Sequence, residues 1–195
     1  MWFGRLLAFF IGIIIFIVIL VAIFGHGGKK PTSTQVMSLP DYAGTNATVS
    51  FTEDGIVNAD SLHRSIRITV SNNQVTMDVL KGYNPQVIQS NSFENNQEAY
   101  TVFLKSINNA GFLAKTNNTK IPDDETGQCA LGNRFILALD QDGTDISRTW
   151  ASTCGSKVGT STGAVQTLQT LFDYQVPNYQ TLVDTVDLSA TTDQQ

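Results

Sequence analysis

A run of 19 residues near the N-terminus limits the possible folds of this chain more than any other feature. From Leu6 to Phe24 the side chains are apolar, and only Gly12 interrupts them. A helix of this length extends about 29 Å at a rise of about 1.5 Å per residue, and the hydrocarbon core of a bilayer is about 30 Å thick. A helix that is apolar on every side does not suit a soluble protein's surface. The run therefore predicts a transmembrane helix that follows a short flank, residues 1–5.

A cleaved secretory signal is the main alternative for this run. The apolar core of a signal is about 7 to 15 residues long and leads to a small-x-small cleavage site. This run is longer, and the one such triplet near its end, Gly25-His26-Gly27, is a poor match. No cysteine lies at its end, which excludes a lipid-modified lipoprotein. A retained anchor is therefore favoured over a cleaved signal.

The charges that flank the run do not settle its orientation. Arg5 precedes it, whereas Lys29 and Lys30 follow it, and this excess slightly favours a cytoplasmic C-terminal side. Long domains, however, cross membranes largely regardless of charge. The following domain has an even number of cysteines, few lysines and many Ser, Thr, Asn, Gln and Gly residues, as exported domains do. We expect a single-pass protein of the cell membrane with its C-terminal domain outside the cytoplasm.

The charge balance limits the possible partners of this domain. Three of the 12 Lys and Arg residues flank the apolar run, which leaves nine basic residues against 17 acidic ones and a balance of about −8. Such a surface repels nucleic acid and makes no polybasic contact with anionic lipid. The bilayer around Leu6–Phe24 is the one lipid partner that we expect, and no nucleic acid is expected.

Beyond the anchor the chain divides into a linker, one domain and a tail. Residues 25–46 contain the Gly, Pro, Ser and Thr typical of a linker. Residues 47–188 are long enough to bury a core as one domain, and residues 189–195 are expected to be a flexible tail. Strand patterns alternate here with helical ones. The prediction is an α+β fold, an antiparallel sheet of about four to six strands with helices packed on one face.

Alternating apolar residues predict two hairpins and an earlier strand. The strand covers residues 47–53 and ends at Asp54-Gly55. In residues 63–80, a two-residue turn at Asn72-Asn73 with positive φ pairs Val70 with Val75 and Arg67 with Asp78. A short strand at 86–89 is possible after this hairpin. The second hairpin consists of residues 134–139 and 145–151 around a turn at residues 140–143.

Apolar residues that recur with the 3.6-residue period of an α-helix predict the helices. Asn95 and Glu98 form a capping-box pattern before a helix that ends at Gly111. Residues 115–128 are polar and read as a long surface loop. A C-terminal helix capped by Ser161 or Thr162 and a second short one after Pro177 complete the pattern.

Cys129 and Cys154 flank the second hairpin almost symmetrically. The pairing of its strands brings the two cysteines together at the open end of the hairpin. In an exported domain we therefore predict a disulfide between them.

One short segment resembles a catalytic signature. Trp150-Ala151-Ser152-Thr153-Cys154 resembles the Thr-Leu-x-Thr-Cys sequence of sortases over five residues, with Thr153 and Cys154 matching. The resemblance implies a cysteine transpeptidase in which Cys154 attacks a peptide bond with help from a histidine and an arginine. Sortases carry that arginine shortly after the cysteine, where this chain has Lys157, and His63 is the one histidine of the domain. A disulfide is the simpler role for Cys154.

No metal or cofactor site is predicted. The acidic pattern of Asp140, Asp142 and Asp145 around Gly143 lacks the spacing and the distal glutamate of an EF-hand, and a hairpin turn explains it. The acidic triplet at residues 123–125 suits a solvated loop. The chain also lacks a phosphate-binding loop and a dinucleotide fingerprint.

These observations favour a non-catalytic protein with a binding or envelope-structural role and an unknown ligand. The expected partner is another envelope protein or a component of the cell wall. Two alternatives stay open: the sortase-like transpeptidase using Cys154, and a subunit of a surface filament or a secretion assembly.

Overall fold

A computed structural model describes residues 37–155 and 159–189. The predicted transmembrane helix, the flank before it, residues 25–36 of the linker and residues 190–195 of the tail lie outside these ranges. In the part of the chain that is described, no helix has both the length and the apolar character needed to cross a membrane. The prediction of a membrane span thus concerns residues about which the structure says nothing.

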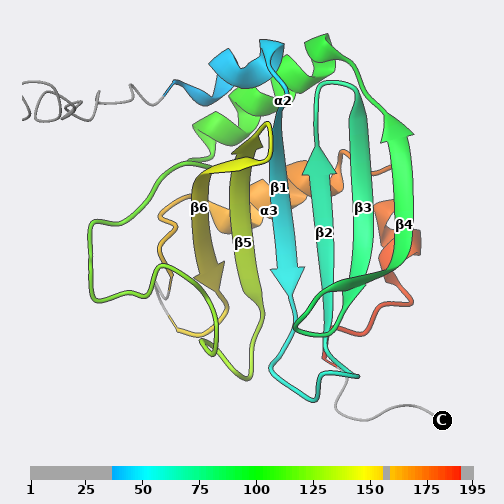
Figure 1. Cartoon of the computed structure of the whole chain (residues 1–195), viewed down its shortest axis with the longest axis vertical. Coiled ribbons are helices and arrows are strands. Elements are labelled where there is room, and N and C mark those ends of the chain that lie inside the picture. The colour runs from blue at the N-terminus through cyan, green and yellow to red at the C-terminus, as the bar shows by residue number, and fades with distance from the viewer. Residues whose placement is uncertain (1–36, 156–158, 190–195) are drawn as a thin grey trace, which may run out of the picture. The chain divides into compact units, whose positions relative to one another are not determined.

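Six strands form one sheet, in which all neighbours are antiparallel (Figure 1). The strands are β1 (Ala47–Asp54), β2 (Arg64–Val70), β3 (Gln74–Lys81), β4 (Gln86–Glu94), β5 (Arg134–Gln141) and β6 (Thr144–Ser152). Their order across the sheet is β4-β3-β2-β1-β5-β6, so β1 is central and joins the two hairpins. The predicted α+β class is confirmed at this level. The strand expected at 86–89 extends to Glu94.

The β2–β3 hairpin has the predicted register. Val70 pairs with Val75, and Arg67 with Asp78. Its turn differs from the expectation, because neither central asparagine has positive φ. The hydroxyl of Ser71 accepts hydrogen bonds from the backbone N–H groups of Asn73 and Gln74, at 3.5 and 3.0 Å, and this side chain stabilises the turn.

In the β5–β6 hairpin the left-handed residues are Asp142 and Gly143, with φ of 51° and 77°. Gln141 and Thr144, on either side of them, are paired. Two consecutive residues with positive φ are typical of the turn that matches the twist of antiparallel strands. The Asp-Gly sequence is therefore explained by backbone geometry.

Helix α2 (Gln97–Asn109) begins one residue later than the capping-box prediction implies. Asn96 is its N-cap, and the side-chain oxygen accepts the N–H of Ala99 at 2.9 Å. Asn95 was the wrong choice because its amide donates instead to the carbonyl of Ser71. The C-terminus is as predicted, with Gly111 at φ 82°. The N–H of Phe112 then bonds to the carbonyl of Ile107, as in a Schellman motif.

Three further helices surround the core. The 3-10 helix η1 (Leu39–Gly44) lies in the segment expected to be linker, and it is ordered because Leu39, Tyr42 and Ala43 are buried. Helix α3 (Val165–Asp173) follows Ala164, which makes no side-chain cap, so neither Ser161 nor Thr162 caps it. Helix α4 (Tyr179–Val183) is a single short turn.

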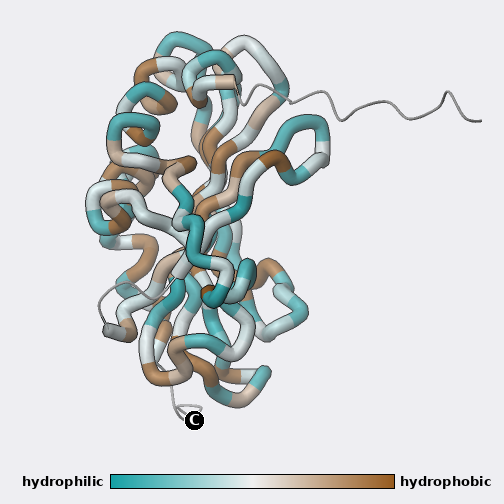
Figure 2. Tube along the Cα trace, turned by 90° about the vertical axis from the view of Figure 1, so that its left-hand side faces the viewer, coloured by the Kyte–Doolittle hydropathy of each residue, from teal (hydrophilic) through white to brown (hydrophobic). Residues whose placement is uncertain are grey.

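The helices lie on one face of the sheet. Figure 1 shows α3 behind the strands, and the view in Figure 2 places the helical coils to the left of the sheet. Strand residues of odd number in β1 and β5, such as Phe51 and Leu137, point to this face and are buried. They form the main core together with Leu104, Phe112 and Phe172. Among residues 37–155 and 159–189, no helix lies on the opposite face, and loops cover only part of it.

Candidate functional site

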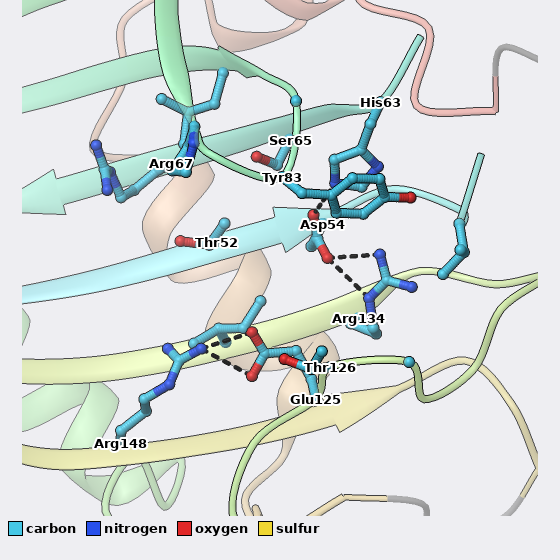
Figure 3. Close-up of a pocket in the computed structure, with 16 residues that line it drawn as sticks. Thr52, Asp54, His63, Ser65, Arg67, Tyr83, Glu125, Thr126, Arg134 and Arg148 are labelled. Carbon is cyan, nitrogen blue, oxygen red and sulfur yellow. Dashed lines mark hydrogen bonds and ion pairs between the residues drawn. The ribbon is translucent and has the colours of Figure 1, made fainter. Parts of the chain in front are cut away.

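The helix-free face of the sheet contains a pocket of about 370 Å³ (Figure 3). Its floor is formed by side chains of β1, β2, β3, β5 and β6. The loop between β1 and β2, the turn between β3 and β4, and the 115–128 loop form its walls. The lining residues are Thr52, Asp54, Val57, His63, Ser65, Arg67, Leu80, Gly82, Tyr83, Pro85, Glu125, Thr126, Gly127, Arg134, Ile136 and Arg148.

A buried charge network lies at one end of the pocket. The guanidinium of Arg134 donates from Nε to Asp54 Oδ2 at 2.8 Å and from Nη2 to the carbonyl of Gly55. The other carboxylate oxygen, Oδ1, accepts His63 Nε2 at 2.8 Å. Arg134 is only 2% exposed and His63 only 3%. A buried cation of this kind needs several partners to offset its loss of hydration, and Arg134 has them.

The hydrogen bonds of His63 define how its ring is held. Nε2 faces the carboxylate of Asp54, and Nδ1 faces the carbonyl oxygen of Ile56 at 3.2 Å. Both partners are acceptors, so the ring is fully hydrogen-bonded when both nitrogens carry protons. Tyr83 stacks on it at a centroid distance of 4.1 Å. Both ring nitrogens of His63 therefore face acceptors of the protein itself.

The 115–128 loop is fixed to the sheet by two contacts. Trp150 is completely buried on this face, and its indole N–H donates to the carbonyl of Pro122 at 2.9 Å. One nitrogen of Arg148, Nη2, donates to both carboxylate oxygens of Glu125, at 2.6 and 2.8 Å. Figure 3 shows the carboxylate of Glu125 and the guanidinium of Arg148 facing one another beside the pocket. Part of the acidic triplet predicted to be solvated is thus an ion-pair partner.

Three polar side chains of the pocket have few or no partners, whereas its carboxylates are fully engaged. Within the described ranges, the hydroxyls of Thr52 and Ser65 have no hydrogen-bond partner. Arg67 makes one long contact, from Nη2 to Asp78 at 3.4 Å, so most of its five N–H donors are unused. Every carboxylate oxygen of Asp54 and Glu125 already accepts a hydrogen bond. The pocket therefore offers unused Arg67 N–H donors and two hydroxyls that can also donate, and its two carboxylates are already occupied.

The cysteines lie at the open end of the β5–β6 hairpin, as predicted. Cys129 and Cys154 form a disulfide, with their Cα atoms 5.4 Å apart. In this state Cys154 has no thiolate for the attack that the sortase resemblance implies. The nearby hydroxyl of Thr153 accepts the backbone N–H of Asn133 and so has a structural partner.

The acidic residues around Gly143 form a turn rather than an assembled ligand set. Asp142 accepts a hydrogen bond from the amide of Asn46 at 3.1 Å, which joins the hairpin tip to the start of β1. Within residues 37–155 and 159–189, no three His, Cys, Asp or Glu side chains are grouped in a way that could hold a metal ion.

A second titratable cluster lies on the helix side, away from the pocket. Burial raises the pKa of Asp173 to about 6, although a hydrogen bond from Tyr179 opposes the shift and the charge of Glu53 adds to it. Burial also raises the pKa of Glu53, against the hydrogen bonds it accepts from Asn133 and Gln169. These groups are tied to one another, and none of them lines the pocket.

Comparison with known proteins adds no assignment. No protein-family model matches the chain, and no curated protein is significantly similar to it. The case for function therefore depends on the pocket itself.

Sequence reasoning missed most of this pocket. His63 was recognised only as an isolated histidine, because its partners Asp54 and Arg134 are 9 and 71 positions away and only the sheet brings them together. The predicted pairing of Arg67 with Asp78 was the one available signal, because it placed both side chains on the polar face of the sheet.

Proposed function

We propose that this protein is a membrane-anchored, extracytoplasmic binding module that does not catalyse a reaction. The observation that carries the proposal is the pocket on the helix-free face, whose walls come from three separate loops. A preformed concave site with a few convergent polar groups is the usual form of a small-ligand site. In this proposal the ligand belongs to another envelope protein or to the cell wall.

Two features of the described structure support binding over catalysis. The histidine has both ring nitrogens engaged by acceptors. The sulfur of Cys154 is bonded to Cys129. Nucleophilic catalysis needs a nucleophile and an accessible base within reach of each other, and the two groups that the sortase resemblance would use are both occupied.

The disulfide supports a location outside the cytoplasm, because disulfides persist mainly in oxidising compartments. The apolar run Leu6–Phe24 supports anchoring by its length and by its lack of charge. The two signals agree, since the anchor would hold the folded domain in the compartment where its disulfide forms.

The proposal is tested with the full chain in detergent micelles and with fractions of the native envelope that contain small molecules, peptides or wall fragments. We expect at least one fraction to raise the melting temperature. The effect should be lost in Thr52→Tyr, which fills the pocket, and kept in Thr69→Tyr, a matched change on the same face outside the lining. Binding that survives Thr52→Tyr, or no binding of any fraction, contradicts the proposal.

The alternative function, a cysteine transpeptidase, predicts a different result in the same samples. An acyl adduct on Cys154, found by intact-protein mass spectrometry after incubation with wall peptides, would support a transpeptidase. We expect the mass of the oxidised chain to remain unchanged.

A further inference from the structure

We infer that the pocket binds the carboxylate of a small, partly apolar ligand, with Arg67 as the main cationic contact and with Thr52 and Ser65 as hydroxyl donors. This inference rests on the proposed binding function and specifies its ligand class. It starts from the imbalance described above, in which Thr52, Ser65 and most of Arg67 are unpartnered while the carboxylates are satisfied. A ligand that completes such a site supplies acceptors.

The three donors come from adjacent strands. Thr52 of β1 is paired with Arg67 of β2, and Ser65 lies two residues before Arg67 on the same face. In Figure 3 the hydroxyl oxygens of Thr52 and Ser65 point in the direction in which the Arg67 side chain extends, away from the buried network. One planar anionic group placed between them would meet all three donors. A guanidinium fork suits the two oxygens of a carboxylate.

The charge in the pocket favours an anion of low charge. Its lining includes three arginines and two carboxylates, an excess of one positive charge before His63 is counted. Arg134 is unavailable because Asp54 and backbone carbonyls use its donors. Arg148 already holds a carboxylate, that of Glu125, which shows that such a group fits against an arginine on this face. Arg148 keeps Nε and Nη1 unused, but Arg67 has the most unused donors, because its one contact, to Asp78 outside the lining, is long at 3.4 Å. One carboxylate would offset the excess charge of the lining.

Apolar groups beside the donors define the rest of the ligand. Leu80 and Ile136 are buried in the floor, although they lie on the face opposite the main core. Val57 and Tyr83 are about half exposed at the rim, at 41% and 50%. Exposed apolar side chains next to a charged floor are typical of sites that hold an amphipathic ligand. The ligand should therefore have a carboxylate at one end and a small apolar body.

Two sources could supply this chemistry, a free carboxylic acid or the C-terminus of a peptide. The test is an NMR titration of the full chain in micelles, in which the arginine Nε–Hε signals are observed. The probes are N-acetyl-leucine and its amide, the tripeptide Ala-Ala-Leu with a free or an amidated C-terminus, and inorganic phosphate.

We expect N-acetyl-leucine to shift the Arg67 signal and to bind at least 10-fold more tightly than its amide. Binding of the free acid alone identifies a small acid, and clearly tighter binding of the free tripeptide identifies a peptide C-terminus. Equal affinity of acid and amide, or tighter binding of phosphate than of either carboxylate, overturns the inference.

Variants separate the direct contact from general charge effects. Arg67→Gln should weaken the binding of the acid at least 10-fold, and Lys105→Gln, which removes the same charge from the exposed surface of α2, should leave it unchanged. Thr52→Val should weaken it about threefold to 10-fold, and Thr69→Val should not. Undiminished binding in Arg67→Gln would refute the assigned contact.

Failure of this inference can be told apart from failure of the proposed function. If none of the probes binds but an envelope fraction still gives a stabilisation that Thr52→Tyr abolishes, the carboxylate assignment is wrong and the binding function stands. If the envelope fractions also have no effect, both are wrong.

Discussion

Asp54 illustrates how one residue can support both the fold and the pocket. Its two oxygens accept hydrogen bonds from His63 and from Arg134, which come from opposite sides of β1 in the sheet. The three side chains close one end of the pocket. Arg67, by contrast, has only one long contact and contributes little to the fold.

This contrast predicts different costs for removing the two arginines. Arg134→Met should lower the free energy of unfolding by about 3 kcal/mol or more, because it leaves a mostly buried carboxylate without its cation. Arg67→Met should change it by less than about 1 kcal/mol, because Arg67 is partly exposed and reaches Asp78 only at 3.4 Å, and Asp78 keeps the hydrogen bond from Ser90. Urea denaturation of the full chain in micelles measures both. Similar losses in the two variants would contradict the structural role assigned to Arg134.

Asp173 predicts a pH dependence on the other side of the sheet. Its folded-state pKa of about 6 is above its ordinary value of 3.8, so the folded state binds this proton more tightly than the unfolded state does. The contribution of Asp173 to stability is therefore full below about pH 4 and is lost as the pH rises through about 6. Asp173→Asn should be more stable than the parent at pH 7, with a smaller difference at pH 4.

Denaturation midpoints of the full chain at the two pH values test this prediction. Asp123→Asn, at an exposed side chain of the 115–128 loop, is the matched control and should show no such gain at pH 7. If the parent chain gains more stability than Asp173→Asn between pH 4 and pH 7, the sign of the prediction is wrong.

At the scale of elements, the β5–β6 hairpin and the 115–128 loop form one unit around the disulfide. The disulfide joins cysteines 25 positions apart and closes a loop that contains all of β5 and β6. Trp150 and Arg148 then connect β6 back to the 115–128 loop. The wall of the pocket that contains Glu125 depends on this unit.

Removal of the disulfide should therefore have a large effect. In the chain-entropy model a loop of this length contributes about 3 to 4 kcal/mol, so a variant with both Cys129→Ser and Cys154→Ser should lose about that much free energy of unfolding. Hydrogen exchange should accelerate most in β6 and in the 115–128 loop. A loss below about 1 kcal/mol, or uniform acceleration across the sheet, would contradict this view of the unit.

At the scale of the whole molecule, the predicted anchor and the disulfide-bonded domain make a joint prediction. The full chain should sediment with membranes, and a chain without residues 6–24 should not. Protease that reaches the outer side of the cell membrane, while that membrane itself stays intact, should degrade the domain. Thiol alkylation without reductant should modify neither cysteine. Recovery of the full chain from the soluble fraction with both cysteines reactive would contradict the anchor and the location together.

Sequence patterns were most informative where the deciding contacts were local. The β2–β3 register followed from alternation and turn length, and Gly111 followed from the need for a left-handed residue after α2. The first turn of α2 was placed one residue early because Asn95 and Asn96 are chemically alike, and only the neighbouring carbonyl of Ser71 distinguishes them. Helix η1 was missed because its order comes from burial against the core, which a six-residue pattern does not reveal.

The sequence by itself determined the class of the fold, the register of the β2–β3 hairpin and the pairing of the two cysteines, because periodicity and turn chemistry act over short distances. Only the tertiary structure decided which polar residues share the pocket. Asp54, His63, Arg134 and Arg148 become neighbours through the order of the strands, with β1 placed between the two hairpins. That order is set by the burial of a shared core, which brings together residues far apart in the chain.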